Sequence, residues 1–444
     1  MNIFAVTLGC KVNQYESQAV LEFLENLGYK IVKSKTEADV IVVNSCTVTA
    51  RSDQKIRQTL SKLKRESPHA ILVLMGCMPQ AFPEKASKIS QADIIIGSLN
   101  RKYISCAIES FAKNRQKIFK VEKNLKAAEF ENLSISRFLK RTRAFLKIQD
   151  GCEEFCSYCI VPFARGRIRS KKIDDILSEA KKLSDSGYKE VVLTGVNLSL
   201  YGKDFGANLI DAIEGVCSIE GIKRVRLGSL EPGVISDKFL SKITSFNKFC
   251  PDFHLSLQSG CDRILKIMNR KYVSKEYFDT VKKLRRAFDS PSISTDVLVG
   301  FPTETDEDFE KTKEFIQKIG FSKIHVFKYS ERAGTKSSKM KDDVSSAAKE
   351  ERSMAVSEIA AESSAKFATS QLGKIMPVLF ESALKEPNYY QGFTPNCVKV
   401  KVRCDRCIKG EIIYTKMRAV QTDEKSPVIH GLLLARGEEQ GMKV

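Results

Sequence analysis

The sequence predicts an α/β protein in three parts: two consecutive parallel-sheet regions and a small all-β barrel at the C-terminus. Apolar strands alternate with amphipathic helices through the first two regions, which is the pattern of buried parallel strands. After Gly373 the alternation ends, and short strands follow one another among turn residues. That change of secondary-structure pattern is typical of a small barrel.

The N-terminal region, residues 1–115, contains four predicted strands at residues 3–8, 39–43, 70–75 and 92–96. Apolar residues recur at helical spacing over 15–27 and 104–111. Strands of this kind joined by helices predict a parallel α/β sheet domain. Residues 116–137 are polar and weakly patterned, and we predict a linker there.

The central region, residues 138–340, repeats the alternation six times, with helices such as 173–186, 277–288 and 306–319 between the strands. The predicted strands are 144–149, 190–194, 224–228, 253–257, 294–299 and 323–327. Six such units predict a partial (β/α)6 barrel, a fold in which the loops after the strands carry the chemistry.

The last part of the chain begins with a predicted connecting helix, residues 341–372, which is charged, Ala-rich and free of Pro. Residues 373–440 then form the predicted all-β barrel, with strands at 376–381, 397–402, 411–414 and 428–435.

The composition favours a polyanionic partner. The formal net charge is +19 at pH 7, and RNA or DNA is the simplest partner for such a chain, although a general basic bias would give the same number. The longest apolar run, residues 70–75, is too short to cross a membrane. The N-terminus has no basic segment followed by a long apolar one, so we expect a cytoplasmic protein without a membrane partner.

Cysteine is the most informative residue type. The chain has 13 Cys and only 4 His. In a reducing compartment, clustered Cys more often bind metal or act in catalysis than form disulfides. Ligation rich in thiolate and poor in His suits iron–sulfur clusters or structural zinc.

Cys152, Cys156 and Cys159 form the strongest motif, Cys-x3-Cys-x-aromatic-Cys, directly after the first predicted barrel strand. Three thiolates can bind three irons of a cubane cluster and leave the fourth iron open for a substrate or cofactor. Half of a zinc site is the alternative, but no second Cys pair follows at zinc-finger spacing.

This motif resembles the signature of the radical-SAM superfamily. The resemblance implies a [4Fe–4S] cluster that binds the amino and carboxylate groups of S-adenosylmethionine (SAM) and, with one electron, generates a 5′-deoxyadenosyl radical. Polar groups within the motif and at the ends of later strands are candidates for SAM contacts: Tyr158, Gly195, Glu231, Gln258 and Asp296.

Cys10, Cys46 and Cys77 are distant in sequence, yet each follows a predicted parallel strand directly. Because parallel strands end at one edge of a sheet, loops at the strand ends bring the three thiols together. Three unrelated buried cysteines are the alternative, since free Cys is common in protein cores. We favour a second three-cysteine cluster.

The segments around these cysteines resemble the methylthiotransferase family of radical-SAM enzymes over nearly the whole chain. The similar segments are residues 9–17, 44–49, 76–80 and 149–166. The resemblance implies two [4Fe–4S] clusters, the second holding the sulfur to be inserted, and two SAM molecules per turnover. It also implies a C-terminal TRAM domain, an electron donor such as flavodoxin or ferredoxin, and a source of sulfur.

Within that family, three short segments resemble the branch that modifies threonylcarbamoyladenosine in tRNA: residues 11–13, 46–49 and 258–261. The target would be the adenosine immediately 3′ of the anticodon, in the anticodon stem-loop. Ser45, Pro79 and residues 228–232 depart mildly from the family's usual motifs. The alternatives are isopentenyladenosine in tRNA, an aspartate of a ribosomal protein, a cluster-bearing RNA-binding regulator without enzyme activity, and zinc at both sites.

Basic residues flank the radical-SAM motif and are candidates for phosphate contacts, although a solvated charged face is the alternative. They are Arg137, Lys140, Arg141, Arg143 and Lys147 before it, and Arg165, Arg167, Arg169, Lys171 and Lys172 after it. In the C-terminal barrel the candidates for RNA contacts are Tyr389, Tyr390, Phe393, Lys399, Lys401 and Arg403.

Overall fold

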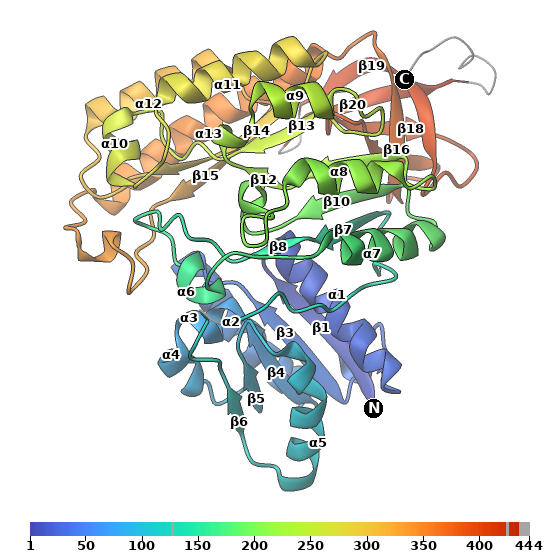
Figure 1. The fold of residues 1–444 in the computed structure, drawn as a ribbon, viewed down its shortest axis with the longest axis vertical. Coiled ribbons are helices and arrows are strands. Elements are labelled where there is room, and N and C mark those ends of the chain that lie inside the picture. Colours follow the sequence, from blue (N-terminus) through green and yellow to red (C-terminus); the bar gives the residue numbers. More distant parts are fainter. Residues whose placement is uncertain (126–127, 140, 423–425, 435–444) are drawn as a thin grey trace.

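The computed structural model describes residues 1–125, 128–139, 141–422 and 426–434. Three regions follow one another in space as in sequence: the N-terminal sheet lies below the central strands, and the C-terminal barrel packs beside them (Figure 1). Lys140 and the predicted strand end at 435 lie outside the described residues. No described helix is both long enough and apolar enough to span a membrane.

The N-terminal region is a six-stranded parallel sheet in the order β2-β1-β3-β4-β5-β6. The strands are β1 (Asn2–Leu8), β2 (Lys30–Ile31), β3 (Val40–Ser45), β4 (Ile71–Gly76), β5 (Ile94–Ile96) and β6 (Ile118–Lys120). Every residue of β3 and β4 is buried, which explains their unbroken apolar sequences. Helices α1 (Lys11–Asn26) and α5 (Ile104–Asn114) pack on one face, and α2 (Ala50–Glu66) packs on the other.

The four strands predicted here are confirmed, and two short ones are added. β6 lies inside the predicted linker of residues 116–137 and pairs with β5 at the sheet edge. Neither β2 nor β6 has a run of apolar residues, because an edge strand is only partly covered.

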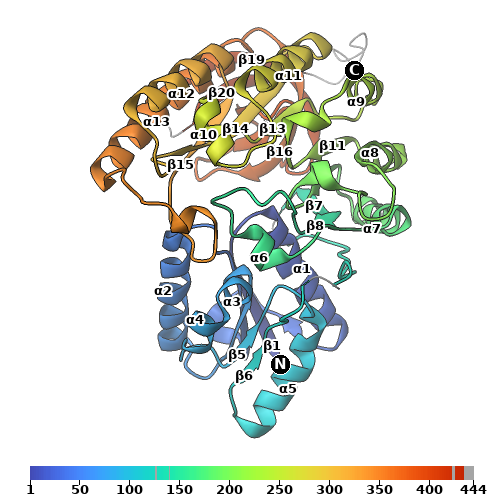
Figure 2. The same cartoon turned by 60° about the vertical axis from the view of Figure 1, so that its left-hand side comes forward.

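The central region contains six parallel strand–helix units, so the predicted partial barrel is confirmed. Its strands are β7 (Arg143–Lys147), β10 (Glu190–Thr194), β11 (Arg224–Leu227) with β12 (Ser229–Leu230), β13 (Asp252–Leu255), β14 (Ser292–Val299) and β15 (Lys323–Lys328). The helices outside them are α7 (Ile173–Asp185), α8 (Leu209–Ser218), α9 (Asp237–Ile243), α11 (Ser274–Ala287) and α12 (Asp306–Ile319), most of them visible in Figure 2. The interruption at Gly228 divides one extended segment into β11 and β12.

The long helix α13 (Ser346–Thr369) packs against β15 and leads into a closed barrel in the order β16-β17-β18-β20-β19. The strands are β16 (Ile375–Ala383), β17 (Tyr389–Phe393), β18 (Lys399–Arg403), β19 (Ile412–Gln421) and β20 (Val428–Leu433). The sequence did not predict β17, because Gly392 and the preceding Pro-Asn suggest a turn. In the barrel, a Cβ on Gly392 would lie 2.4 Å from the Leu379 carbonyl oxygen, so glycine permits the close approach of two strands.

A buried carboxylate joins the central strands to the C-terminal barrel. Glu190 accepts from Arg226 Nε at 2.9 Å and from Arg224 at 3.4 Å. The same arginines donate to carbonyl oxygens of the barrel, at 3.0 Å for Phe393 and 3.2 Å for Thr394. Burial alone would raise the pKa of Glu190, but the charges of Arg226, Arg143 and Arg224 lower it to about 2.

Substituting Glu190→Gln removes the buried negative charge that pairs with Arg224 and Arg226. We expect the free energy of unfolding at pH 7 to fall by about 3–5 kcal/mol, measured by urea denaturation. The unfolded carboxyl has a pKa near 4.3. Because the folded pKa lies below that, the stabilisation is complete above about pH 4.3 and disappears as the pH falls toward 2. The difference between the two proteins should therefore narrow on acidification; a constant difference would contradict this.

Candidate active site

Cys10, Cys46 and Cys77 lie at the carboxyl edge of the N-terminal sheet, after the neighbouring strands β1, β3 and β4. Cys10 directly precedes α1, and Cys77 begins the short helix α3 (Cys77–Ala81). The pKa of Cys46 is raised to about 12, first by burial and then by the charges of Cys77 and Cys10. The three thiols therefore lie within electrostatic range of one another, as the positions of the strand ends predict.

Two asparagines and a glycine shape this edge. Asn13 donates to Asn44 Oδ1 at 3.0 Å and to the Ser45 carbonyl at 3.1 Å, while its own Oδ1 accepts from Cys10 Sγ at 3.1 Å. Gly76 has a φ of +105°, and a Cβ there would lie 2.4 Å from Asn44 Oδ1. Only glycine fits at this last position of β4, directly before Cys77.

Cys152, Cys156 and Cys159 occupy the loop after β8 (Gln149–Asp150), where the barrel prediction put them. The Cys152 amide donates to the Gly166 carbonyl at 3.0 Å, and the Ser157 amide donates to the Met268 carbonyl at 2.9 Å. Burial first, then neighbouring thiols, raises the pKa of Cys152 to about 11 and of Cys159 to about 12.

Each triad has one sulfur that accepts a hydrogen bond from an arginine. Arg165 Nε donates to Cys77 Sγ at 3.2 Å, and Arg270 Nη1 donates to Cys156 Sγ at 3.2 Å. Glutamates hold both guanidinium groups: Glu16 pairs with Arg165, and Glu231 pairs with Arg270. Burial raises the pKa of the Cys156 thiol, and the charge of Arg270 opposes that rise. Three sulfurs at each place, each able to bind a different iron, fit an iron–sulfur cluster.

Within the described ranges, no three His, Cys, Asp or Glu side chains are close enough together to hold a single metal ion. A cubane cluster takes each thiolate on a different iron, so its ligands need not converge on one point.

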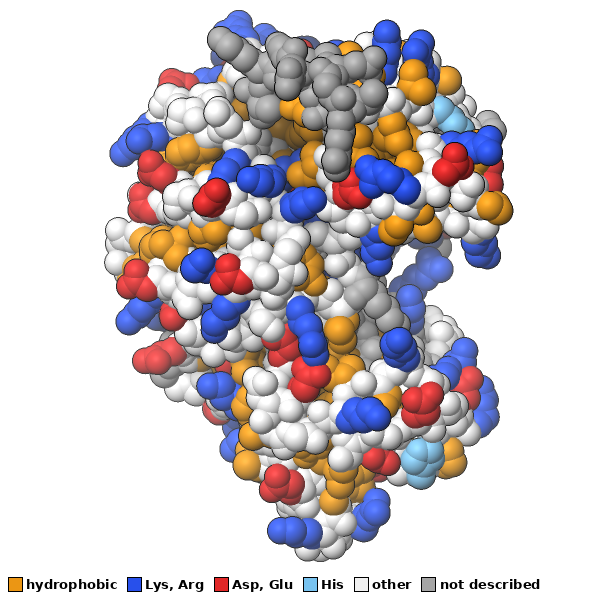
Figure 3. Space-filling model, turned by 90° about the vertical axis from the view of Figure 1, so that its right-hand side faces the viewer, with side chains coloured by type: hydrophobic (Ala, Val, Ile, Leu, Met, Phe, Trp, Pro, Cys, Tyr) orange, Lys and Arg blue, Asp and Glu red, His pale blue; other side chains and the backbone are white. Residues whose placement is uncertain are grey.

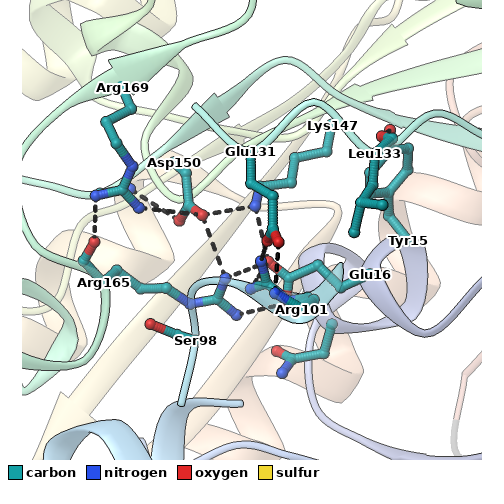
Figure 4. Close-up of polar contacts among 12 residues, drawn as sticks. Tyr15, Glu16, Ser98, Arg101, Glu131, Leu133, Lys147, Asp150, Arg165 and Arg169 are labelled. Carbon is teal, nitrogen blue, oxygen red and sulfur yellow. Dashed lines mark hydrogen bonds and ion pairs between the residues drawn. The ribbon is translucent and has the colours of Figure 1, made fainter. Parts of the chain in front are cut away.

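Figure 4 shows the buried network around Glu16, which joins the two triads. The Glu16 carboxylate from α1 contacts Arg101 at 2.6 Å, Lys147 at 2.7 Å and Arg165 Nη2 at 3.0 Å. Asp150, just before the radical-SAM loop, accepts from Lys147 at 2.6 Å and lies 3.4 Å from Arg165. All five side chains are at most 4% exposed.

Buried ion pairs show that one of our predictions, the contact of these cations with RNA, is partly wrong. Lys147, Arg165, Arg169 and Lys171 are buried and ion-paired, so they are not available for RNA phosphates. Arg143 is also paired, with Glu381 and Glu190. The runs that look like a charged surface in the sequence mostly form internal ion pairs.

Gly195 and Asp296 line a cavity of about 890 Å³ between the three regions, together with Cys10 and with Phe393 and Lys399 of the C-terminal barrel. Glu231 lines a second cavity of about 710 Å³ beside Cys156 and Arg270. The other two candidates for SAM contacts lie elsewhere: Tyr158 packs edge-to-face on Phe301 at 6.5 Å, and Gln258 has a φ of +71° in a bridge to Val297. The five candidates are therefore spread over several places around the strand ends.

Sequence analysis missed Arg270, His254 and His325. His254 Nε2 lies 3.3 Å from Asp296 Oδ2, and its ring centroid lies 5.9 Å from that of His325. The alternation of the two histidines with apolar residues along β13 and β15 was the available signal, since every second side chain faces the inside of a barrel. Arg270 lies in the loop after the helix at Asp262–Ile267 and had no such signal.

Fold and site together define a radical-SAM enzyme. The family model described as Radical SAM superfamily matches residues 146–316, and the model described as Uncharacterized protein family UPF0004 matches residues 2–97. The fold also resembles the radical S-adenosylmethionine methyltransferase TsrM from Kitasatospora setae. The TM-score is 0.55 at 13% identity, over 73% of this chain and 72% of that one.

More particularly, the chain belongs to the family of radical-SAM methylthiotransferases and is an enzyme of that class, with a [4Fe–4S] cluster and SAM as its cofactors. It is 36% identical to the threonylcarbamoyladenosine tRNA methylthiotransferase MtaB of Bacillus subtilis (strain 168), over 93% of this chain and 92% of that one. The MtaB of Aquifex aeolicus (strain VF5) is 37% identical, over 88% and 95%. The tRNA-2-methylthio-N(6)-dimethylallyladenosine synthase of Finegoldia magna (strain ATCC 29328) is 33% identical, over 93% and 91%.

The raised pKa of Cys152 predicts slow alkylation of this thiol in the metal-free protein. At pH 8, we expect iodoacetamide to label the exposed Cys106 about a hundredfold faster than Cys152, because the thiolate is the nucleophile. Labelling of Cys152 should rise as the pH approaches 11. Peptide mass spectrometry after timed quenching measures both rates, and equal rates at pH 8 would contradict the expectation.

Proposed function

We propose that this enzyme converts N6-threonylcarbamoyladenosine, immediately 3′ of the anticodon in tRNA, to its 2-methylthio derivative. The observation that carries the proposal is the order of similarity. Relatives named for threonylcarbamoyladenosine are 36–37% identical, whereas those named for dimethylallyladenosine are 33–34% identical.

We assign Cys152, Cys156 and Cys159 to the cluster that binds SAM, and Cys10, Cys46 and Cys77 to a second [4Fe–4S] cluster. When bound, these groups supply radical chemistry at carbon 2 of the adenine and the methylthio group that replaces its hydrogen. Tyr158, Gly195, Glu231, Gln258 and Asp296 remain our candidates for SAM contacts. The proposed reaction also requires an external electron donor of the flavodoxin or ferredoxin kind, a sulfur source and a second SAM.

The chain's own residues hold the two cysteine triads in position and provide a cavity for the substrate nucleoside. Arg165 and Arg270 each hold a positive charge at one sulfur, and the Glu16 network fixes the distance between the two triads. The large cavity between the regions has room for a nucleoside, because ligand pockets of roughly 300–1,000 Å³ bury molecules of that size. An adenosine in the anticodon loop can be unstacked to enter it at a cost of about a few kcal/mol.

For RNA binding we propose the exposed cations and the C-terminal barrel, which we interpret as a TRAM domain at residues 373–440. The side chains of four of the predicted cations are exposed: Arg137, Arg141, Arg167 and Lys172. Tyr389 lies opposite Arg403 and beneath Lys401, whose ammonium is 4.4 Å from the ring centroid. Figure 3 shows Lys and Arg side chains spread over one whole face, among fewer acidic ones, as suits contact with a folded RNA.

Mass spectrometry of tRNA nucleosides tests the proposal. Deleting the gene should remove 2-methylthio-threonylcarbamoyladenosine and let its precursor accumulate. The wild-type gene and the matched variant Cys106→Ala should restore the product, while Cys46→Ala and Cys156→Ala should reduce it below detection. Loss of the methylthio derivative of isopentenyladenosine instead would contradict the substrate, and unchanged nucleosides would contradict action on tRNA.

A further inference from the structure

Two exposed lysine side chains line the large cavity, and among the described residues neither makes a direct contact with a carboxylate. Lys11 enters from the first turn of α1 and Lys323 from the start of β15, and both line the cavity beside His254 and His325. In the described part of the chain, neither ammonium has a hydrogen bond or an ion pair within 4 Å.

The carboxylates that line the same cavity are engaged elsewhere. Asp252 Oδ2 lies 2.7 Å from Arg226, and Asp296 Oδ2 lies 3.3 Å from His254. Burial first, then the charge of Lys323 and, less strongly, that of Lys11 lower the pKa of His325, with Asp296 acting in the opposite direction. Both lysines are therefore close enough to His325 to act on it electrostatically.

The position of Lys11 adds a second argument. A cation in the first turn of a helix is unfavourable, because the helix dipole places partial positive charge there. Lys11 is the first residue of the 16-residue helix α1 and follows Cys10 directly. An anionic ligand in the cavity would offset both the ammonium and the helix terminus.

The rest of the lining suits a nucleoside base. Val12, Phe327, Phe367 and Phe393 contribute apolar surface to the same cavity, and Ser292, Ser294 and Ser322 contribute hydroxyl groups. An aromatic and apolar wall facing a pair of cations fits a flat ring that carries a negatively charged substituent.

We propose that Lys11 and Lys323 bind the carboxylate of the threonylcarbamoyl substituent and thereby select this substrate. The inference rests on the proposed function and extends it to a named subsite. Isopentenyl is an uncharged hydrocarbon and would leave both ammonium groups unpaired. Because Lys11 adjoins Cys10, a carboxylate bound there also anchors the base beside the first triad.

The test compares Lys11→Gln, Lys323→Gln and the double variant with wild-type holoenzyme. Lys238→Gln is the matched control, since it removes one charge from an exposed side chain on the outer helix α9. The probes are three anticodon stem-loop RNAs with threonylcarbamoyladenosine, isopentenyladenosine or adenosine at the target position. Fluorescence anisotropy gives the Kd of each pair, and circular dichroism confirms that the variants are folded.

We expect each single substitution to weaken binding of the threonylcarbamoyl RNA about tenfold to a hundredfold, as loss of a hydrogen bond to a charged group does. Binding of the other two RNAs should change less than twofold, and Lys238→Gln should resemble wild type with all three. Equal weakening for all three RNAs would mean that the lysines contact phosphates, which overturns the subsite.

The two proposals fail in different ways. If wild-type enzyme methylthiolates the threonylcarbamoyl RNA and Lys11→Gln binds it normally, the subsite is wrong and the function stands. If wild-type enzyme modifies only the isopentenyl RNA, both the proposed function and the proposed subsite are wrong.

Discussion

The arrangement of the N-terminal region against the central region depends on a buried carboxylate, that of Glu16. It comes from the N-terminal sheet region, and its partners Lys147 and Arg165 come from the central region. Charges taken out of water are tolerated only when they are paired, so each member of this network requires the others in place. Two regions that could have moved against one another as separate domains are therefore held in one arrangement.

This constraint reaches the chemistry because Arg165 has two roles. Its guanidinium is paired with Glu16 and donates to Cys77. Arg270 repeats the arrangement with Glu231 and Cys156. In both triads an anchored cation adjoins sulfur, and in the first triad the same arginine, Arg165, also stabilises the interface between the two regions.

Much of this could be predicted from local sequence. Buried strands such as β3 and β4 are uniformly apolar, and the cysteines that follow them come together because parallel strands end at one edge. Long-range polar contacts could not be predicted. Arg165 looks like a surface residue in sequence, since nothing local reveals that Glu16, 149 positions earlier in the chain, is buried against it. Edge strands β2 and β6 were missed for a related reason: partial burial leaves no apolar run.

The large cavity has walls from all three regions: Cys10 and Lys11 from the first, strands β13 to β15 from the second, and Phe393 and Lys399 from the third. Its outline is thus a property of the whole chain. A chimaera carrying the C-terminal barrel of a relative would exchange one wall and keep the other two. Natural exchange of that barrel among relatives would in the same way offer evolution a means of reshaping the pocket while both cysteine triads stay untouched.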